Sequence, residues 1–160
     1  MLASEDIMLS AQDVQTTTHQ VWSSVLGMKV QTAAVDEAAL REQHILAGCV
    51  EITGDHRLAI QMACPLALAR MAGATMLMIS EEELEQEMLQ DAFGELCNLV
   101  GGLLKNKLGG RNKLSTPTIA EGEHLNLRAR GSHVLFQEGM VCQHQPFLVS
   151  IFDDSEHQAA

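Results

Sequence analysis

The chain has 160 residues, 46% of them hydrophobic and 19% charged, which is enough apolar material to bury one core of ordinary size. Its formal net charge of −11 disfavours binding to nucleic acid and to anionic membrane surfaces, since both are negatively charged. Only 3% of the residues are aromatic, so the ring platforms that stack on single-stranded bases are nearly absent. We expect a single domain over residues 1–160 with a basic or mixed-charge protein as its partner, although the acidity would also serve solubility alone.

The cysteines and the N-terminus predict a cytoplasmic protein. No cysteine belongs to a C-x-x-C pair and each lies in an apolar segment, as is typical of free thiols in a reducing compartment; they are Cys49, Cys64, Cys97 and Cys142. Residues 1–10 carry two acids and no basic residue, unlike a secretory signal. The apolar stretch Leu58–Ile79 contains Arg70, which disfavours a membrane-spanning helix and favours a strand followed by a core helix.

The first half of the chain alternates helical and strand patterns. The expected elements, in order, are a helix over Ser10–Leu26 stopped by Gly27, a strand over Met28–Val35, a hairpin of Ile45–Ile52 and Arg57–Ala63 with a turn at Thr53-Gly54-Asp55, and a helix over Leu66–Met71 that starts at Pro65 and ends near Gly73.

The second half opens with a strong helix start, because Ser80 and Glu83 stand at capping-box spacing. That helix is expected to run to about Leu108 and stop at Gly109-Gly110. Strands are then expected at Lys113–Ile119, Leu125–Arg130, His133–Gln137 and Phe147–Phe152, with breaks at Gly122, Gly131 and Gly139. Pro117 predicts a sheet edge for the first of these strands.

The order helix, strand, hairpin occurs once before Pro65 and again after Ser80, a weak internal two-fold repeat. The predicted fold class is α+β: one mixed or antiparallel sheet of about six strands, with two long helices packed on one face.

The second long helix carries a narrow polar stripe. On an ideal helix of about 100° per residue, apolar residues cover one half, and six others fall within an arc of roughly 80°: Glu87, Asp91, Glu95, Asn98, Gly102 and Lys105. Asn is a mediocre helix former that favours caps and turns, so Asn98 deep inside a long helix indicates a selected role.

Three glycines lie on or beside this stripe: Gly94, Gly101 and Gly102. Each costs a helix interior about 1 kcal/mol relative to Ala, so their presence favours close approach of a partner surface to bare backbone. A kink in the helix, or tight packing against the protein's own sheet, would explain them equally well.

The pattern D-x-x-x-E-x-x-N-x-x-G, from Asp91 to Gly101, resembles the signature of the CheX/CheC/FliY phosphatases of bacterial chemotaxis. The order of the flanking segments also resembles this family, including the Ser-Thr-Pro-Thr step at Ser115–Thr118. CheC-type members carry a second E-x-x-N pair on the first helix, and Asp13–His19 contains none. The chain is therefore more similar to CheX, which implies a homodimer.

The resemblance implies a phosphatase that removes the aspartyl phosphate of a CheY-like receiver domain. Glu95 and Asn98 would be the catalytic pair: Asn98 orients the attacking water, and Glu95 pairs with the receiver's active-site Lys. Asp91 and the three glycines would help to bind the partner. The chain would need no cofactor of its own, because the phosphorylated receiver supplies Mg²⁺.

Other functions stay open at this point. The same fold would also serve as a receiver-binding or flagellar-switch adaptor that hydrolyses nothing, and Glu95 alone is equally typical of a solvated helix acid. A metal site at Cys142 and His144, with His124 and His133 nearby, lacks structural-zinc spacing. No phosphate-binding glycine loop is present, which disfavours nucleotide binding.

Overall fold

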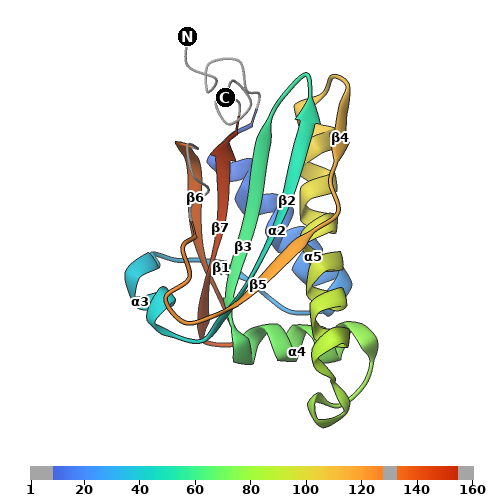
Figure 1. Ribbon diagram of the computed structural model, residues 1–160, viewed down its shortest axis with the longest axis vertical. Helices are drawn as coiled ribbons and strands as arrows, with labels where there is room; N and C mark the ends of the chain where they lie inside the picture. The colour runs from blue at the N-terminus through green and yellow to red at the C-terminus, as the bar shows by residue number, and fades with distance from the viewer. Residues whose placement is uncertain (1–8, 128–132, 155–160) are drawn as a thin grey trace.

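The computed structural model describes residues 9–127 and 133–154, and within them seven strands form one sheet in which every pairing is antiparallel (Figure 1). The strands are β1 (Gln31–Thr32), β2 (Ile45–Gly54), β3 (Leu58–Pro65), β4 (Asn112–Leu114), β5 (Thr118–Gly122), β6 (His133–Cys142) and β7 (Gln145–Asp153). The helices are α2 (Ala11–Leu26), α3 (Glu37–Glu42), α4 (Leu66–Leu77), the 3-10 turn η1 (Glu81–Glu83) and α5 (Gln86–Leu108). The predicted α+β class is confirmed.

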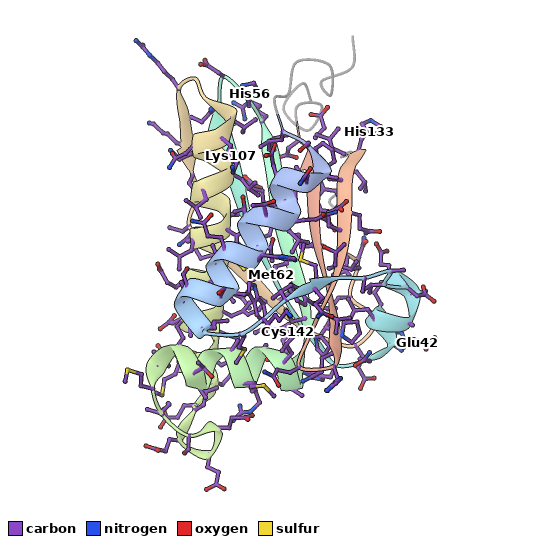
Figure 2. The ribbon with its side chains drawn as sticks, turned by 180° about the vertical axis from the view of Figure 1, so that it is seen from behind. Glu42, His56, Met62, Lys107, His133 and Cys142 are labelled. Atoms are coloured by element: carbon purple, nitrogen blue, oxygen red, sulfur yellow. The ribbon has the colours of Figure 1, made fainter. Side chains whose placement is uncertain are left out.

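The alternation of side chains along the strands creates two apolar layers. Leu46 and Val50 of β2 join the main core, which the helices α2, α4 and α5 cover. Ile45 and Ala47 point to the other face and join a smaller cluster with Leu40 of α3. Figure 2 shows α2 lying diagonally across the sheet, with α4 crossing one end. The two expected long helices thus share one face, and α4 joins them there.

The sheet reflects the internal repeat that the sequence pattern indicated. Its order is β1-β6-β7-β3-β2-β4, with β5 also paired to β2. The first half of the chain supplies α2, β1, β2 and β3, and the second supplies α5, β4 with β5, β6 and β7. If each strand is replaced by its counterpart in the other half, the strand order stays the same but is read in the opposite direction. α2 and α5 are therefore equivalent elements of one pseudo-symmetric layer.

Trp22 anchors α2 to the centre of the sheet. Its ring is fully buried and stacks on Phe147 of β7, with the centroids 4.6 Å apart and the planes at 21°. Both ends of the helix are capped: Ser10 forms a capping box with Asp13, and Gly27 is left-handed at φ 64°. The predicted limits of this helix are confirmed.

One expectation for the first half is wrong, and one helix was missed. The strand expected over Met28–Val35 is only Gln31–Thr32, because the chain leaves the sheet after the Ala33 N–H donates to the Gly139 carbonyl. The sequence interpretation also missed α3, whose start is capped by the Asp36 carboxylate accepting the Ala38 N–H at 3.0 Å.

The region between α4 and α5 also differs from expectation. α4 continues through Gly73 to Leu77, since a Cβ at Gly73 would lie 3.3 Å from Leu89 of α5 and the glycine serves helix packing. The Ser80–Glu83 capping box exists, but it caps η1. α5 begins only at Gln86, later than expected. It ends at Leu108 with Gly109 as its C-cap, as predicted.

The later strands are rearranged around Pro117 and Gly139. The strand expected over Lys113–Ile119 is split into β4 and β5, which both lie at the sheet edge beside β2 with Pro117 between them. Gly139 lies inside β6 instead of ending it, and the hairpin turns at Gln143 and His144, both at positive φ. Residues 125–127 form no strand, and the rest of the expected strand, residues 128–130, lies outside the described residues.

No helix in the described part of the chain is long and apolar enough to cross a membrane.

Replacing Trp22 by Ala should lower the free energy of unfolding by about 3–5 kcal/mol, because it removes a large, fully buried ring and leaves a cavity over the sheet. Trp22 is the only tryptophan, so the variant has no tryptophan fluorescence to follow. Urea denaturation is therefore monitored by far-ultraviolet circular dichroism. Val25→Ala, an exposed position on the same helix, should change stability by less than about 0.5 kcal/mol. Equal losses in the two variants would contradict the anchoring role of Trp22.

Candidate active site

Polar contacts from α4 and β5 hold the start of α5 and the η1 segment that precedes it. The Arg70 guanidinium of α4 donates to the carbonyls of Glu81 and Leu84, at 2.6 and 3.3 Å. Glu121 of β5 accepts from the Gln86 side chain and contacts His44 at 2.7 Å. The hydrogen bond from Gln86, and to a smaller extent the one with His44, lowers the pKa of Glu121 below its ordinary value. The first turn of α5 is therefore held in one position relative to α4 and β5.

The inner face of α5 supplies much of the core. The residues Leu89, Phe93, Leu96, Val100 and Leu104 are all buried. They recur at three- and four-residue spacing, so the polar residues between them are directed away from the core. The predicted division of this helix into an apolar half and a polar stripe is confirmed.

A pocket of about 420 Å³ lies between α5 and the segment that leads into β5. Its lining residues are Gln90, Asp91, Gly94, Glu95, Asn98, Pro117 and Ile119. The structure thus brings together four of the six predicted site residues, Asp91, Gly94, Glu95 and Asn98, while Gly101 and Gly102 do not line the pocket.

Asn98 is the unusual residue of this pocket. Its side chain is half-buried, and its Oδ1 atom is inaccessible to solvent with no hydrogen-bond partner among the described residues. An unpaired buried acceptor costs a folded protein about 1–3 kcal/mol. The unpaired carboxamide therefore lowers the stability of the free protein.

Glu95 and Asp91 are both exposed at the pocket. Within the described residues neither carboxylate makes an ion pair, so the alternative of a Glu95 salt bridge with a neighbouring Lys has no support there. Two carboxylates and a carboxamide on one helix face can bind a cationic group and orient a small polar molecule beside it.

The three glycines have different surroundings. A Cβ at Gly101 would lie 2.6 Å from Val50 Cγ2, and one at Gly94 would lie 3.0 Å from Pro117 Cγ. Tight packing against the protein's own sheet, one of the alternatives raised above, therefore accounts for Gly101, which is buried. Gly94 packs internally and also lines the pocket, whereas nothing lies within 4 Å of a Cβ at Gly102. Only Gly102 has open space above it.

The sequence interpretation missed the opposite wall of the pocket. Gln90 precedes the motif by one residue, while Pro117 and Ile119 come from the segment interpreted as one continuous strand. Ser115 fixes this wall, because its N–H donates to the Glu51 carbonyl at 2.8 Å and its hydroxyl accepts the Glu51 N–H at 2.9 Å. Pro117 was the available signal, since proline donates no hydrogen bond and interrupts a strand.

Cysteine or metal chemistry finds no support near this pocket. Burial raises the pKa of Cys97, which lies between the two predicted catalytic residues, and raises that of Cys49 to about 11, so neither is a thiolate nucleophile at neutral pH. Over the described residues no group of three or more His, Cys, Asp or Glu is placed to hold a metal ion. Cys142 is buried at the end of β6, and His144 is exposed in the adjacent turn.

The family model described as chemotaxis phosphatase CheX matches residues 46–139. This span includes β2 through most of β6, and therefore the whole pocket. The match covers more than half of the sequence, so the chain belongs to this family, and the resemblance seen in the motif of α5 is confirmed. A search of curated proteins finds no match.

Solved structures show the same fold. CheX from Vibrio vulnificus has a TM-score of 0.74 at 16% identity, covering 91% of this chain and 97% of its own. CheX from Desulfovibrio desulfuricans has a TM-score of 0.70 at 20% identity, with coverages of 88% and 96%. A chain of the CheX–CheY–BeF3–Mg²⁺ complex from Borrelia burgdorferi has a TM-score of 0.63 at 13% identity, with coverages of 88% and 94%. Identities this low establish the fold and leave the residue roles to the site itself.

The neighbouring glycines Gly101 and Gly102 should respond oppositely to a methyl group. Gly101→Ala should destabilise the protein by about 1–3 kcal/mol, because the new Cβ would collide with Val50 and force α5 away from β2. Gly102→Ala should stabilise it by up to about 1 kcal/mol, because the site is open and Ala favours helix. Paired urea denaturation curves measure both, and a stabilising Gly101→Ala would contradict the packing described here.

Proposed function

We propose that this member of the chemotaxis phosphatase CheX family hydrolyses the aspartyl phosphate of a CheY-like receiver domain, with Asn98 orienting the attacking water. The observation that carries the proposal is the placement of Asn98 beside Glu95 in one pocket on the polar face of α5. The family description supports a phosphatase. The fold shared with a CheX–CheY–BeF3–Mg²⁺ complex supports a receiver as the partner.

In the proposed reaction this chain forms no covalent bond to the phosphoryl group. Phosphoryl transfer is accelerated chiefly by holding the attacking oxygen in line with the breaking bond and by stabilising charge on the phosphoryl group. Once the Asn98 side chain turns out into the pocket, a water that donates one hydrogen to its Oδ1 keeps a lone pair free to face the phosphorus. Because the carboxamide is neutral, it adds no negative charge beside the phosphate. A neutral hydrogen-bond acceptor is the group that this task requires.

Glu95 serves a different purpose in this proposal. A carboxylate aimed at a phosphoryl group is repelled, so Glu95 requires a cation, and the active-site Lys of the receiver provides one. Glu95 and Asn98 are three residues apart on α5 and therefore project from the same helix face. Asp91, one turn before Glu95 in the same pocket, extends the negative surface that meets the receiver. The receiver also supplies Mg²⁺, which neutralises the phosphoryl oxygens.

The decisive experiment compares Asn98→Ala with Asn106→Ala, an exposed asparagine on the same helix that does not line the pocket. Phosphate release from a phosphorylated chemotaxis receiver in Mg²⁺ should fall about 100-fold in kcat for Asn98→Ala, because the water loses its orienting group. Asn106→Ala should match the native protein. Binding to the receiver activated with beryllofluoride and Mg²⁺ should persist in both variants.

Two further readouts separate catalysis from folding and docking. Asn98→Ala should be at least as stable as the native protein, because it removes an unpaired buried acceptor and a poor helix former. Glu95→Gln should weaken binding to the activated receiver, because it removes the charge that pairs with the receiver's Lys. Binding without any acceleration of phosphate release, across several receivers, would overturn the phosphatase and favour the adaptor function.

A further inference from the structure

The segment joining α4 to η1 presents an apolar projection, which we call the Met78 knob and define as residues 76–79. Met78 is 91% exposed and Leu77 is 40% exposed, while Met76 and Ile79 are partly buried. Outside this segment, the only large hydrophobic residue exposed to a comparable degree in the described part of the chain is Val25, at 38%. A cluster of exposed apolar side chains on an otherwise acidic protein indicates an interaction surface.

Met78 is also in an unfavourable backbone conformation. It caps α4 with φ 59° and ψ 41°, and its N–H donates to the carbonyls of Ala74 and Thr75. This left-handed position normally belongs to Gly, because any other residue brings its Cβ too close to the backbone. The same residue therefore combines a strained backbone with an almost fully exposed apolar side chain. Backbone strain of this kind is typical of a functional position, and the exposed side chain adds no packing to the fold.

The knob is held rigidly beside an acidic surface. Ser80 and Glu83 close a capping box directly after it, and Arg70 ties η1 to α4 through the Glu81 carbonyl. The carboxylates that follow are all exposed; they are Glu81, Glu82, Glu83, Glu85 and Glu87. A partner that covers the knob must therefore offer an apolar depression surrounded by basic groups.

The acidic surface continues along α5 into the pocket through Glu87, Asp91 and Glu95. Both views show the α4–α5 linking segment beyond the N-terminal end of α5, on the side away from the sheet (Figures 1 and 2). Glu95 lies nine residues after the start of the helix, about 14 Å along its axis. A receiver domain of about 100 residues has a radius of gyration of roughly 13 Å, so one receiver seated on the pocket is wide enough to reach the knob.

We propose that the Met78 knob is a second receiver contact, an apolar anchor that sets affinity and orientation while Glu95 and Asn98 act at the phosphoryl group. This inference rests on the proposed function, since it places the same receiver on both surfaces. The capped, tied geometry pre-organises the anchor, so little conformational freedom is lost on binding. The knob touches no reacting group, and its contribution is to binding alone.

The test is Met78→Gly, which removes the side chain and places the residue best suited to the left-handed position. The variant should be as stable as the native protein or more so. Its KM for the phosphorylated receiver, and its Kd for the receiver activated with beryllofluoride and Mg²⁺, should rise about tenfold or more, as expected for losing one buried Met side chain. Its kcat should not change. Val25→Ala, on the far helix α2, should alter none of these values.

The outcomes separate this inference from the proposed function. Unchanged KM and Kd in Met78→Gly, with kcat still lost in Asn98→Ala, would overturn the anchor and leave the phosphatase standing. A native protein that binds the activated receiver without hydrolysing phosphate, but binds it more weakly after Met78→Gly, would support the anchor and overturn the phosphatase. If Met78→Gly instead changes the oligomeric state in sedimentation and leaves Kd unchanged, the knob contacts a second copy and the anchor is overturned.

Discussion

The distance between α5 and β2 is the constraint on which the rest of the structure depends. Two glycines make that distance short: a Cβ at Gly101 would collide with Val50, and one at Gly48 would lie 2.5 Å from the Cys97 sulfur. With both side chains absent, the helix settles directly onto the strand. Asn98 lies on the row of α5 beside Gly101 and Gly94, so the same close approach places it in the pocket that Pro117 also lines.

Two residues of the proposed receiver surface carry a local cost to the fold, as do Thr17, His19 and Trp22 of α2, whose buried polar atoms are also unpaired among the described residues. Asn98 buries an acceptor with no partner in the described protein, and Met78 combines a left-handed backbone with an exposed apolar side chain. Natural sequences are locally consistent except where function requires otherwise, so such exceptions are expected to gather at functional sites. Asn98 and Met78 stand at either end of one acidic surface that includes Asp91 and Glu95.

The sequence predicted the parts that follow from local chemistry. The limits of α2 and the end of α5 followed from helical periodicity and glycine stops, and the pocket residues from Asp91 to Asn98 followed from the helical stripe. The failures arose where long-range contacts decide the outcome. Gly73 and Gly101 looked like a helix end and a partner surface, but each makes room for a neighbouring element, Leu89 or Val50. The second wall of the pocket was missed for the same reason, because the position of Pro117 depends on Ser115 bonding to β2.

The pseudo-symmetry of the sheet shows why this fold alone does not define the activity. α2 and α5 occupy equivalent places, and the strand order is unchanged when the halves are exchanged. The two helices nevertheless use their faces differently. α2 buries Thr17, Thr18 and Trp22, and its exposed positions Gln12, Thr16 and Gln20 carry no charge. Nothing in the backbone prevents α2 from presenting an acid and an amide as α5 does. The chemistry is therefore confined to one half of a symmetric scaffold by a few side chains, and a function for any protein with this scaffold has to be argued from the residues on each of the two helices separately.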